Sequence, residues 1–299
     1  MRKIYRFAFL FLLFVPRLLP AQDDLLELIK DNKPPVIYTE ATFKTSRIVI
    51  GQSIENTAQG NLNLVFTHHF GALNTGYENL FGLHQSVVRI GAEYGFTRWL
   101  ASGFGLNSDR NTWDGFLKFK IFRQKSGGKK FPLTISAFVS TAWYTTKWEN
   151  ADRKNYITSR ATYCFQLLFA RKFGERLSLQ FTPSMVHKNL VLTRDDHNDI
   201  FTIGGGGRLK ITDRISLNAE YHHIFRKQVV STQVYDSFSF GVDLETGGHV
   251  FQIFLTNSSG ENEEAFLANT TGRWGRGDIF LGFNINRIFT LVTPKEFRK

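Results

Sequence analysis

Between about residues 61 and 289, the sequence alternates polar and apolar residues in successive runs of about ten. In one of these runs, Trp113 and Leu117 fall on one face, while Asp114 and Lys118 fall on the other. Successive side chains of a β-strand point to opposite faces, so such a run predicts a strand with one apolar and one polar face. The length of the runs matches the roughly 9–11 residues that a tilted strand needs to cross a bilayer.

About twelve such runs are present, and single-chain bacterial barrels use an even number of strands. They predict an all-β protein, a transmembrane antiparallel up-and-down β-barrel. A soluble β-sandwich also has alternating strands, but the strand length and the aromatic content of 15% favour the barrel. The predicted strands are 62–70, 86–95, 99–106, 113–122, 132–145, 160–173, 177–187, 199–211, 215–225, 236–246, 249–257 and 277–290.

Short and long connections alternate along these strands, as they do in barrels with short periplasmic turns and long outer loops. Three of the short turns share a polar-Arg-apolar pattern, at residues 97–99, 175–177 and 213–215. The long connections include residues 71–85, 146–159 and 258–276. An even strand number with this alternation predicts that both termini lie in the periplasm of a Gram-negative bacterium.

The two ends of the chain are expected to lie outside the barrel, which is predicted to span residues 61–293. Residues 1–21 have the basic start, apolar centre and small residue at Ala21 that are typical of a signal peptide. Residues 22–60 are interpreted as a periplasmic tail, of which Thr42 to Ile50 form either a plug or an extra strand. Residues 294–299 are expected to be a C-terminal tail.

Composition excludes several other classes of protein. Cys164 is the only cysteine, so the chain has no internal disulfide. No segment after the signal has about 18 consecutive apolar residues, which excludes a helical membrane protein. The net charge of +11 is spread along the chain without a basic cluster, so nucleic acid is not an expected partner. The expected partners are outer-membrane lipid, lipopolysaccharide and, during biogenesis, the barrel-assembly machinery.

Four stretches of the sequence resemble an uncharacterised family of outer-membrane β-barrels from Bacteroidota, domain of unknown function 5777. The first runs from Ile48 to Gly71, and the others are 112–118, 170–173 and 243–252. The resemblance covers nearly the whole chain after the signal. It implies a β-barrel and brings no activity, ligand or catalytic residue.

Strand parity predicts a polar lumen lined by charged side chains. These side chains form either an electrostatic filter for anions or a salt-bridged packing network in a narrow barrel. The candidates are Arg89, Glu93, Asp114, Lys118, Lys120, Lys172, Arg208, Lys210, Glu220 and His222.

Four consecutive glycines, Gly204 to Gly207, lie in the middle of a predicted strand. They indicate either space for a plug or ligand, or a bulge. A metal or haem site would need His69, His222 and Glu220 to converge across the lumen. Neither a metal nor a cofactor is expected.

An enzyme is not expected either. The residue types of a hydrolase are present in His249 and Ser258, but these lie at opposite ends of one strand, about 30 Å apart at roughly 3.3 Å per residue. The predicted function is porin-like or ligand-selective passage of a small solute. The alternative is a closed structural or docking barrel that presents outer loops 146–159 and 258–276. The acidic run Glu261–Glu264 makes the second loop a candidate surface for a cation or a partner.

Overall fold

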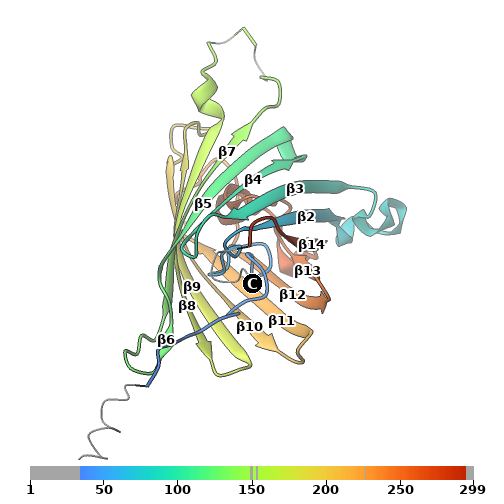
Figure 1. Cartoon of the computed structure of the whole chain (residues 1–299). Helices are drawn as coiled ribbons and strands as arrows, with labels where there is room; N and C mark the ends of the chain where they lie inside the picture. Colours follow the sequence, from blue (N-terminus) through green and yellow to red (C-terminus); the bar gives the residue numbers. More distant parts are fainter. Residues whose placement is uncertain (1–33, 149–150, 153, 226, 294–299) are drawn as a thin grey trace, which may run out of the picture.

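The computed structural model describes residues 34–148, 151–152, 154–225 and 227–293, and within them twelve strands form a closed barrel (Figure 1). The predicted signal peptide, the first part of the predicted tail and residues 294–299 lie outside the described residues. The barrel strands are β2 (Asn61–Ala72), β3 (Ser86–Gly95), β4 (Leu100–Asn107), β5 (Thr112–Phe122), β7 (Thr134–Tyr144), β8 (Ala161–Phe173), β9 (Leu177–Lys188), β10 (Asp199–Lys210), β11 (Ile215–Ile224), β12 (Ser237–Thr246), β13 (His249–Thr256) and β14 (Phe280–Thr290).

Each barrel strand pairs antiparallel with its neighbour in the chain, and β14 closes the barrel against β2. At this seam Thr290 pairs with Asn61, so the two ends of the wall lie side by side. The structure confirms the predicted up-and-down barrel of twelve strands. The predicted strand bounds differ from the observed ones by at most three residues.

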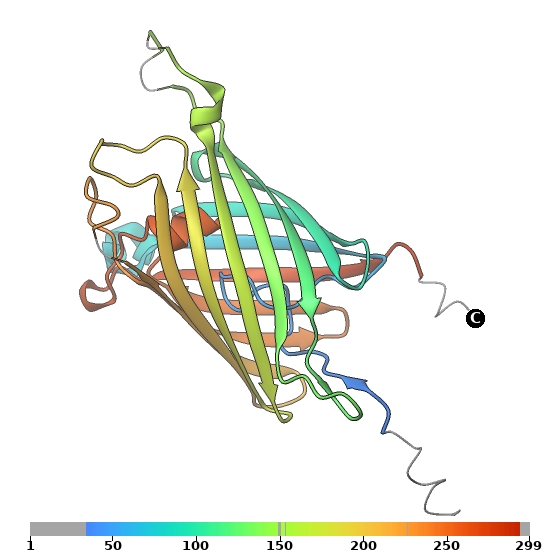
Figure 2. The ribbon, with the colours of Figure 1, turned by 90° about the vertical axis from the view of Figure 1, so that its left-hand side faces the viewer.

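The two ends of the barrel differ in their connections (Figure 2). One end, here called the turn end, carries the short turns 96–99, 174–176, 211–214 and 247–248. It also carries the 123–133 connection, in which β6 (Lys125–Ser126) pairs with β1 (Ile37–Tyr38) outside the wall. The other end, the loop end, carries the longer connections 73–85, 145–160, 189–198, 225–236 and 257–279 and the short 108–111.

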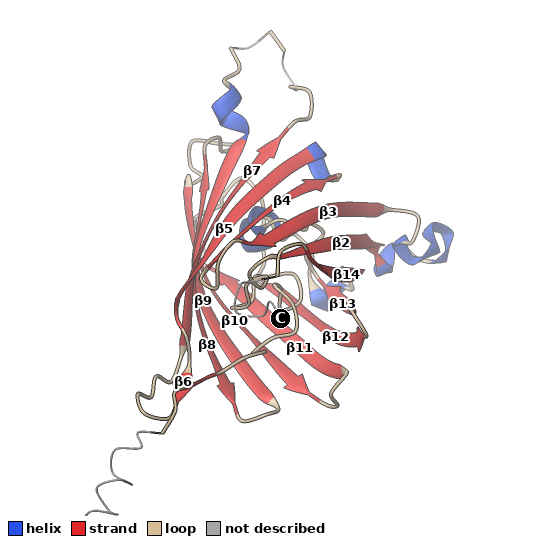
Figure 3. Ribbon diagram, in the orientation of Figure 1, coloured by secondary structure: helices blue, strands red, loops and turns tan. Residues whose placement is uncertain are grey.

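Helices are few and short, and they belong to the connections at the loop end (Figure 3). None in the described part of the chain is long and apolar enough to cross a bilayer. They are α2 (Glu263–Ala268) and the 3-10 turns η1 (Leu73–Thr75), η2 (Tyr77–Gly82), η3 (Asp109–Asn111), η4 (Ile157–Arg160) and η5 (Trp274–Arg276).

The wall has an exposed apolar outer face and a buried inner face. In β5, Trp113 is 55% exposed, whereas Asp114 and Lys118 are 6% and 1% exposed. The sequence predicts a polar inner face, but the observed inner face is only partly polar. Phe138 and Leu168 are buried on it, within one apolar cluster that includes residues of the chain inside the barrel. A segment of chain that fills a lumen carries apolar side chains, and these need apolar partners on the wall. Polar wall groups facing them would be buried without hydrogen bonds, which is costly.

Candidate functional site

The lumen is occupied by the chain itself. Residues 41–58, here called the inserted segment, enter from the turn end and loop back to β2 (Figure 1). They form no strand of the barrel sheet, and an isolated bridge joins Arg47 to Gln52. Five large apolar side chains of the segment are at most 3% exposed and pack in the buried cluster with the wall. These side chains are Phe43, Ile48, Val49, Ile50 and Ile54.

The tip of the inserted segment is held by Glu220 of β11. Its carboxylate accepts hydrogen bonds from the backbone N–H groups of Val49, Ile50 and Gly51, at 3.3, 2.8 and 2.9 Å. Hydrogen bonds to an ionised acceptor are stronger than neutral ones. The side chain of a wall strand thus satisfies three donors of a segment that has no regular structure of its own.

On the opposite side of the lumen, Lys118 of β5 holds the same segment through its carbonyl groups. Its Nζ donates to the oxygens of Ser46, Ser53 and Glu55 at 3.2, 3.1 and 3.1 Å. An ammonium group has three protons to donate, so this lysine is fully satisfied by the inserted segment. Closer to the turn end, Nη1 of Arg208 donates to the carbonyl oxygen of Ala41 at 3.2 Å.

Gly204 to Gly207 lie where the inserted segment approaches the wall. The register of β10 runs without a shift from Thr202 to Lys210, so no bulge forms there. A Cβ atom on Gly206 would lie 2.7 Å from Cδ1 of Ile48, and one on Gly204 would lie 2.2 Å from Nδ1 of His222. The glycines that face the lumen therefore make room for the inserted segment and for a neighbouring wall residue.

A second stretch of chain enters the lumen from the loop end. Residues 257–272, here called the inward loop, fold back into the barrel and carry α2 (Figure 2). The Asn262 side chain caps α2 by accepting a hydrogen bond from the Ala265 N–H at 2.8 Å. The inward loop meets the inserted segment where Nε2 of Gln52 donates to Glu263 at 2.9 Å. The two insertions thus touch inside the barrel.

The expectation that the acidic run Glu261–Glu264 forms an exposed surface is wrong. These residues are at most 5% exposed, and basic groups of the barrel interior pair with the carboxylates of Glu263 and Glu264. Glu264 accepts from Nη2 of Arg110 at 2.8 Å, forms an ion pair with Lys188 at 3.3 Å and accepts from the Tyr144 hydroxyl. The apolar residues 265–268 directly after the run are the sequence signal that was missed, since they favour burial of the whole turn.

All of the ten lumen candidates except His222 fall into three groups in the structure. Arg89 and Asp114 pair with each other, and Glu93 accepts from Ser46 Oγ of the inserted segment at 2.9 Å. Lys118, Arg208 and Glu220 hold the inserted segment as described, and Lys120 lies 3.5 Å from Glu55 of that segment. Two candidates lie at the rim of the turn end, where Lys172 pairs with Glu175 and Lys210 with Asp213.

The histidines do not come together with Glu220 as a metal site. His69 packs against Phe254 with ring centroids 5.1 Å apart, and His222 packs against Phe266 at 5.2 Å. Among the described residues, no group of three or more His, Cys, Asp or Glu side chains has the arrangement of a metal site. His249 and Ser258 lie at opposite ends of β13, and His249 contacts Arg287 at 2.8 Å.

Two cavities flank the inserted chain. The cavity at the loop end has a volume of about 330 Å³ and is lined in part by Arg110, Lys188 and Glu264. The cavity at the turn end has a volume of about 340 Å³ and is lined in part by Lys44 and Glu55. The two cavities share no lining residue, and the inserted segment and the inward loop lie between them.

The Arg89–Asp114 pair is expected to stabilise the wall. Arg89 Nε and Nη2 donate to the Asp114 carboxylate at 2.8 and 2.5 Å. Gly105 of the strand between them leaves room, because a Cβ there would lie 2.3 Å from Nη2. Breaking a buried ion pair by removing one charge costs about 3–5 kcal/mol. We expect Asp114→Asn to lower the free energy of unfolding in urea by this amount, and the exposed control Asp213→Asn to leave it unchanged. Equal stability of the two variants would contradict a structural role of the pair.

Comparison with known proteins places the chain in a family. A search of curated protein sequences finds no match. Solved structures with a similar arrangement include the NanC porin, with 8% identity and a TM-score of 0.48 over 77% of this chain and 100% of that one. An outer membrane channel from Pseudomonas putida F1 has 13% identity and a TM-score of 0.45, over 79% and 97% of the two chains. The model of the membrane bound beta barrel domain (DUF5777) matches residues 43–289, a range that includes most of the inserted segment as well as the wall. The chain therefore belongs to the membrane bound beta barrel domain (DUF5777) family.

Proposed function

We propose that this membrane-bound barrel is a porin-like channel of a Gram-negative outer membrane, which passes a small solute when the inserted segment is displaced. The observation that carries this proposal is how the lumen is filled. The inserted segment is not a strand of the wall, and polar contacts to Glu220, Lys118 and Arg208 hold it in place. Water can replace these polar contacts at a modest net cost, so the main cost of displacing the segment is the exposure of its five buried apolar side chains. The inserted segment therefore acts as a plug.

The orientation that we propose places the turn end and both chain termini in the periplasm. The first and last barrel strands end side by side at the turn end. Short turns are typical of the periplasmic side of outer-membrane barrels, and long loops of the outer side. In this orientation the plug enters from the periplasm, and the cavity lined by Arg110 and Lys188 opens towards the outside.

The filled lumen also favours a second candidate function, a closed barrel with a structural or docking role. In that case the inserted segment and the inward loop are permanent parts of the core. The two functions differ in one property, because only a channel has an open state that carries current.

Single-channel recording of the intact chain in a planar bilayer tests the proposal, with a heat-dependent gel shift to show that the barrel is folded. We expect long closed periods interrupted by discrete current steps. A folded protein that stays silent over the whole voltage range, both intact and without the plug, would overturn the channel and support the closed barrel.

A further inference from the structure

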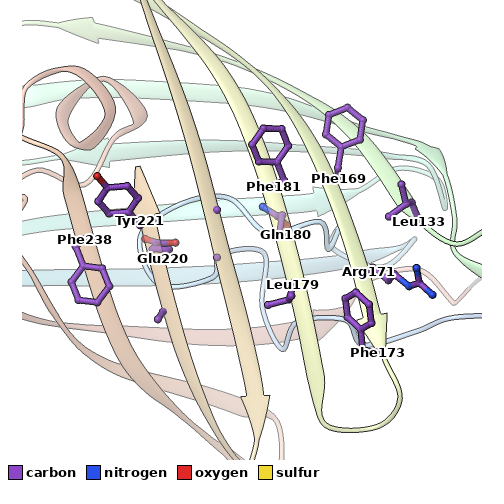
Figure 4. Close-up of a pocket in the computed structure, with 13 residues that line it drawn as sticks. Leu133, Phe169, Arg171, Phe173, Leu179, Gln180, Phe181, Glu220, Tyr221 and Phe238 are labelled. Atoms are coloured by element: carbon purple, nitrogen blue, oxygen red, sulfur yellow. The ribbon is translucent and has the colours of Figure 1, made fainter. Parts of the chain in front are cut away.

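The outer face of the wall carries a groove of about 720 Å³ over β8 to β12 (Figure 4). In the strand register, Phe169, Phe181, Gly205, Tyr221 and Phe238 form one row across five strands. Gly205 is the middle member of this row and has no side chain. Aromatic rings therefore stand on both sides of a gap in the lipid-facing surface.

The next row towards the turn end continues this gap. It consists of Arg171, Leu179, Gly207 and Ala219, each paired with the next. The floor of the groove is thus built from two glycines and an alanine on adjacent strands. On the opposite face of the same strands, Gln180 and Glu220 bond to the inserted segment (Figure 4).

Arg171 provides the only charged side chain on the lipid face of these two rows. It is exposed, lies two residues before β8 ends at Phe173, and its Cζ is 4.8 Å from the centre of the Phe173 ring. It forms no ion pair with any residue that the structure describes. Arginine on the lipid face is tolerated near the interface and costly at the midplane. A guanidinium group there matches the geometry of a phosphate oxyanion.

We propose that the groove binds one anionic glycerophospholipid, with its phosphate group on Arg171 and an acyl chain over Gly207 and Gly205. Gly205 lies two residues along the strand direction and two strands across from Arg171. At roughly 3.3 Å per residue and 4.8 Å per strand, the two residues are about 12 Å apart. The path between them runs from the membrane interface towards mid-strand, as an acyl chain does. The choice of a phospholipid over lipopolysaccharide rests on the proposed orientation, because it places Arg171 in the periplasmic leaflet. Lipid binding itself is independent of channel activity.

Two variants and two matched controls test this site. Arg171→Gln removes the charge, and Arg214→Gln removes an exposed arginine from another turn at the same end. Gly205→Leu fills the groove, since the nearest heavy atom to a Cβ there is the Gln180 oxygen at 3.3 Å. Gly115→Leu adds the same side chain to the lipid face of β5, where the nearest atom is the Gly103 oxygen at 3.6 Å.

The measurement is native mass spectrometry of the full chain, delipidated in mild detergent and titrated with phosphatidylglycerol. We expect one tightly bound lipid on the intact chain and on both controls. Arg171→Gln is expected to weaken its binding by about ten-fold, the loss of roughly one charge-assisted contact. Gly205→Leu is expected to weaken it by about as much, because the leucine side chain takes the place of the acyl chain.

Four results would overturn the proposal. Equal binding by all four variants would show that the groove is not a lipid site. If Arg214→Gln lost as much affinity for phosphatidylglycerol as Arg171→Gln, the lipid would be attracted by the basic rim in general and not by this site. Tighter binding of lipid A than of phosphatidylglycerol at Arg171, or a dimer that Gly205→Leu dissociates, would assign the groove to a different occupant.

Discussion

Removing residues 34–58 from the chain is expected to turn an intermittent channel into a steadily conducting one. The deletion takes away the five buried apolar side chains that fill the middle of the lumen. The wall keeps its own contacts, since β2 starts at Asn61 and the Gly60 N–H still donates to the Gly95 oxygen at 2.8 Å. Lys118 then faces water in place of three carbonyl groups. Single-channel current in a planar bilayer measures the change, and a folded deletion variant without current would show that the inserted segment alone does not close the barrel.

A point variant tests the same plug without removing part of the core. Glu220→Gln replaces the carboxylate that accepts three N–H groups of the segment. Loss of about 1.5–3 kcal/mol of charge-assisted bonding corresponds to a roughly 10- to 100-fold higher open probability. Asp114→Asn is the matched control, because this buried carboxylate bonds to Arg89 of the wall. Equal opening by both variants would show a general loss of packing.

Replacing Glu264 by glutamine is expected to release the inward loop. The pKa of Glu264 lies below its ordinary value, because attraction from Lys188 and Arg110 outweighs burial, which would raise it. The ionised form therefore stabilises the insertion. We expect Glu264→Gln to increase the hydrogen-exchange rate of residues 262–268 by about 10- to 100-fold. The increase is smaller than for a fully buried ion pair, because Arg110, one partner of Glu264, is partly exposed.

Glu261→Gln is the matched control, and the opposite result is expected. Burial raises the pKa of Glu261 well above its ordinary value, so a neutral side chain removes a cost of insertion. Exchange of the loop then stays the same or slows. Faster exchange in Glu261→Gln than in Glu264→Gln would contradict the assignment of Glu264 as the group that holds the loop.

The same two carboxylates give the insertion a pH dependence of defined sign. Stability from Glu264 is present above its ordinary pKa and is lost as the pH falls through its lowered value. The cost from Glu261 appears as the pH rises through its raised value, so acid relieves it. In Glu261→Gln, acid is therefore expected to loosen the loop, whereas in Glu264→Gln acid tightens it. Hydrogen exchange measured from about pH 7 to well below the ordinary glutamate pKa of 4.5 checks both directions, after correction for the intrinsic pH dependence of amide exchange.

The wall was predictable from the sequence because its signals are local. Alternation along a run such as β5 and a turn such as Asp213-Arg214 each depend on a few adjacent residues, and together they fix strand bounds. Parity also assigns a side chain such as Lys118 to one face. It does not reveal the partner of that side chain, because Ser46 and Ser53 lie 72 and 65 residues away in the chain.

The inward loop was not predicted for the same physical reason. Length and polarity made residues 258–276 look like an outer loop, and an acidic run is usually solvated. Burial of Glu264 depends on Arg110 and Lys188, which come from the connection before β5 and from β9. Charge neutralisation of this kind exists only after the barrel has brought the three residues together.

The place of the inserted segment in the chain has a consequence for folding order. The segment leads directly into β2, the strand that closes the wall against β14. The segment enters from the turn end, where β2 begins. It can therefore stay outside the barrel until the wall has closed and then insert, without a free chain end passing through the barrel. The topology therefore allows closure of the wall and insertion of the segment to be two separate steps of folding.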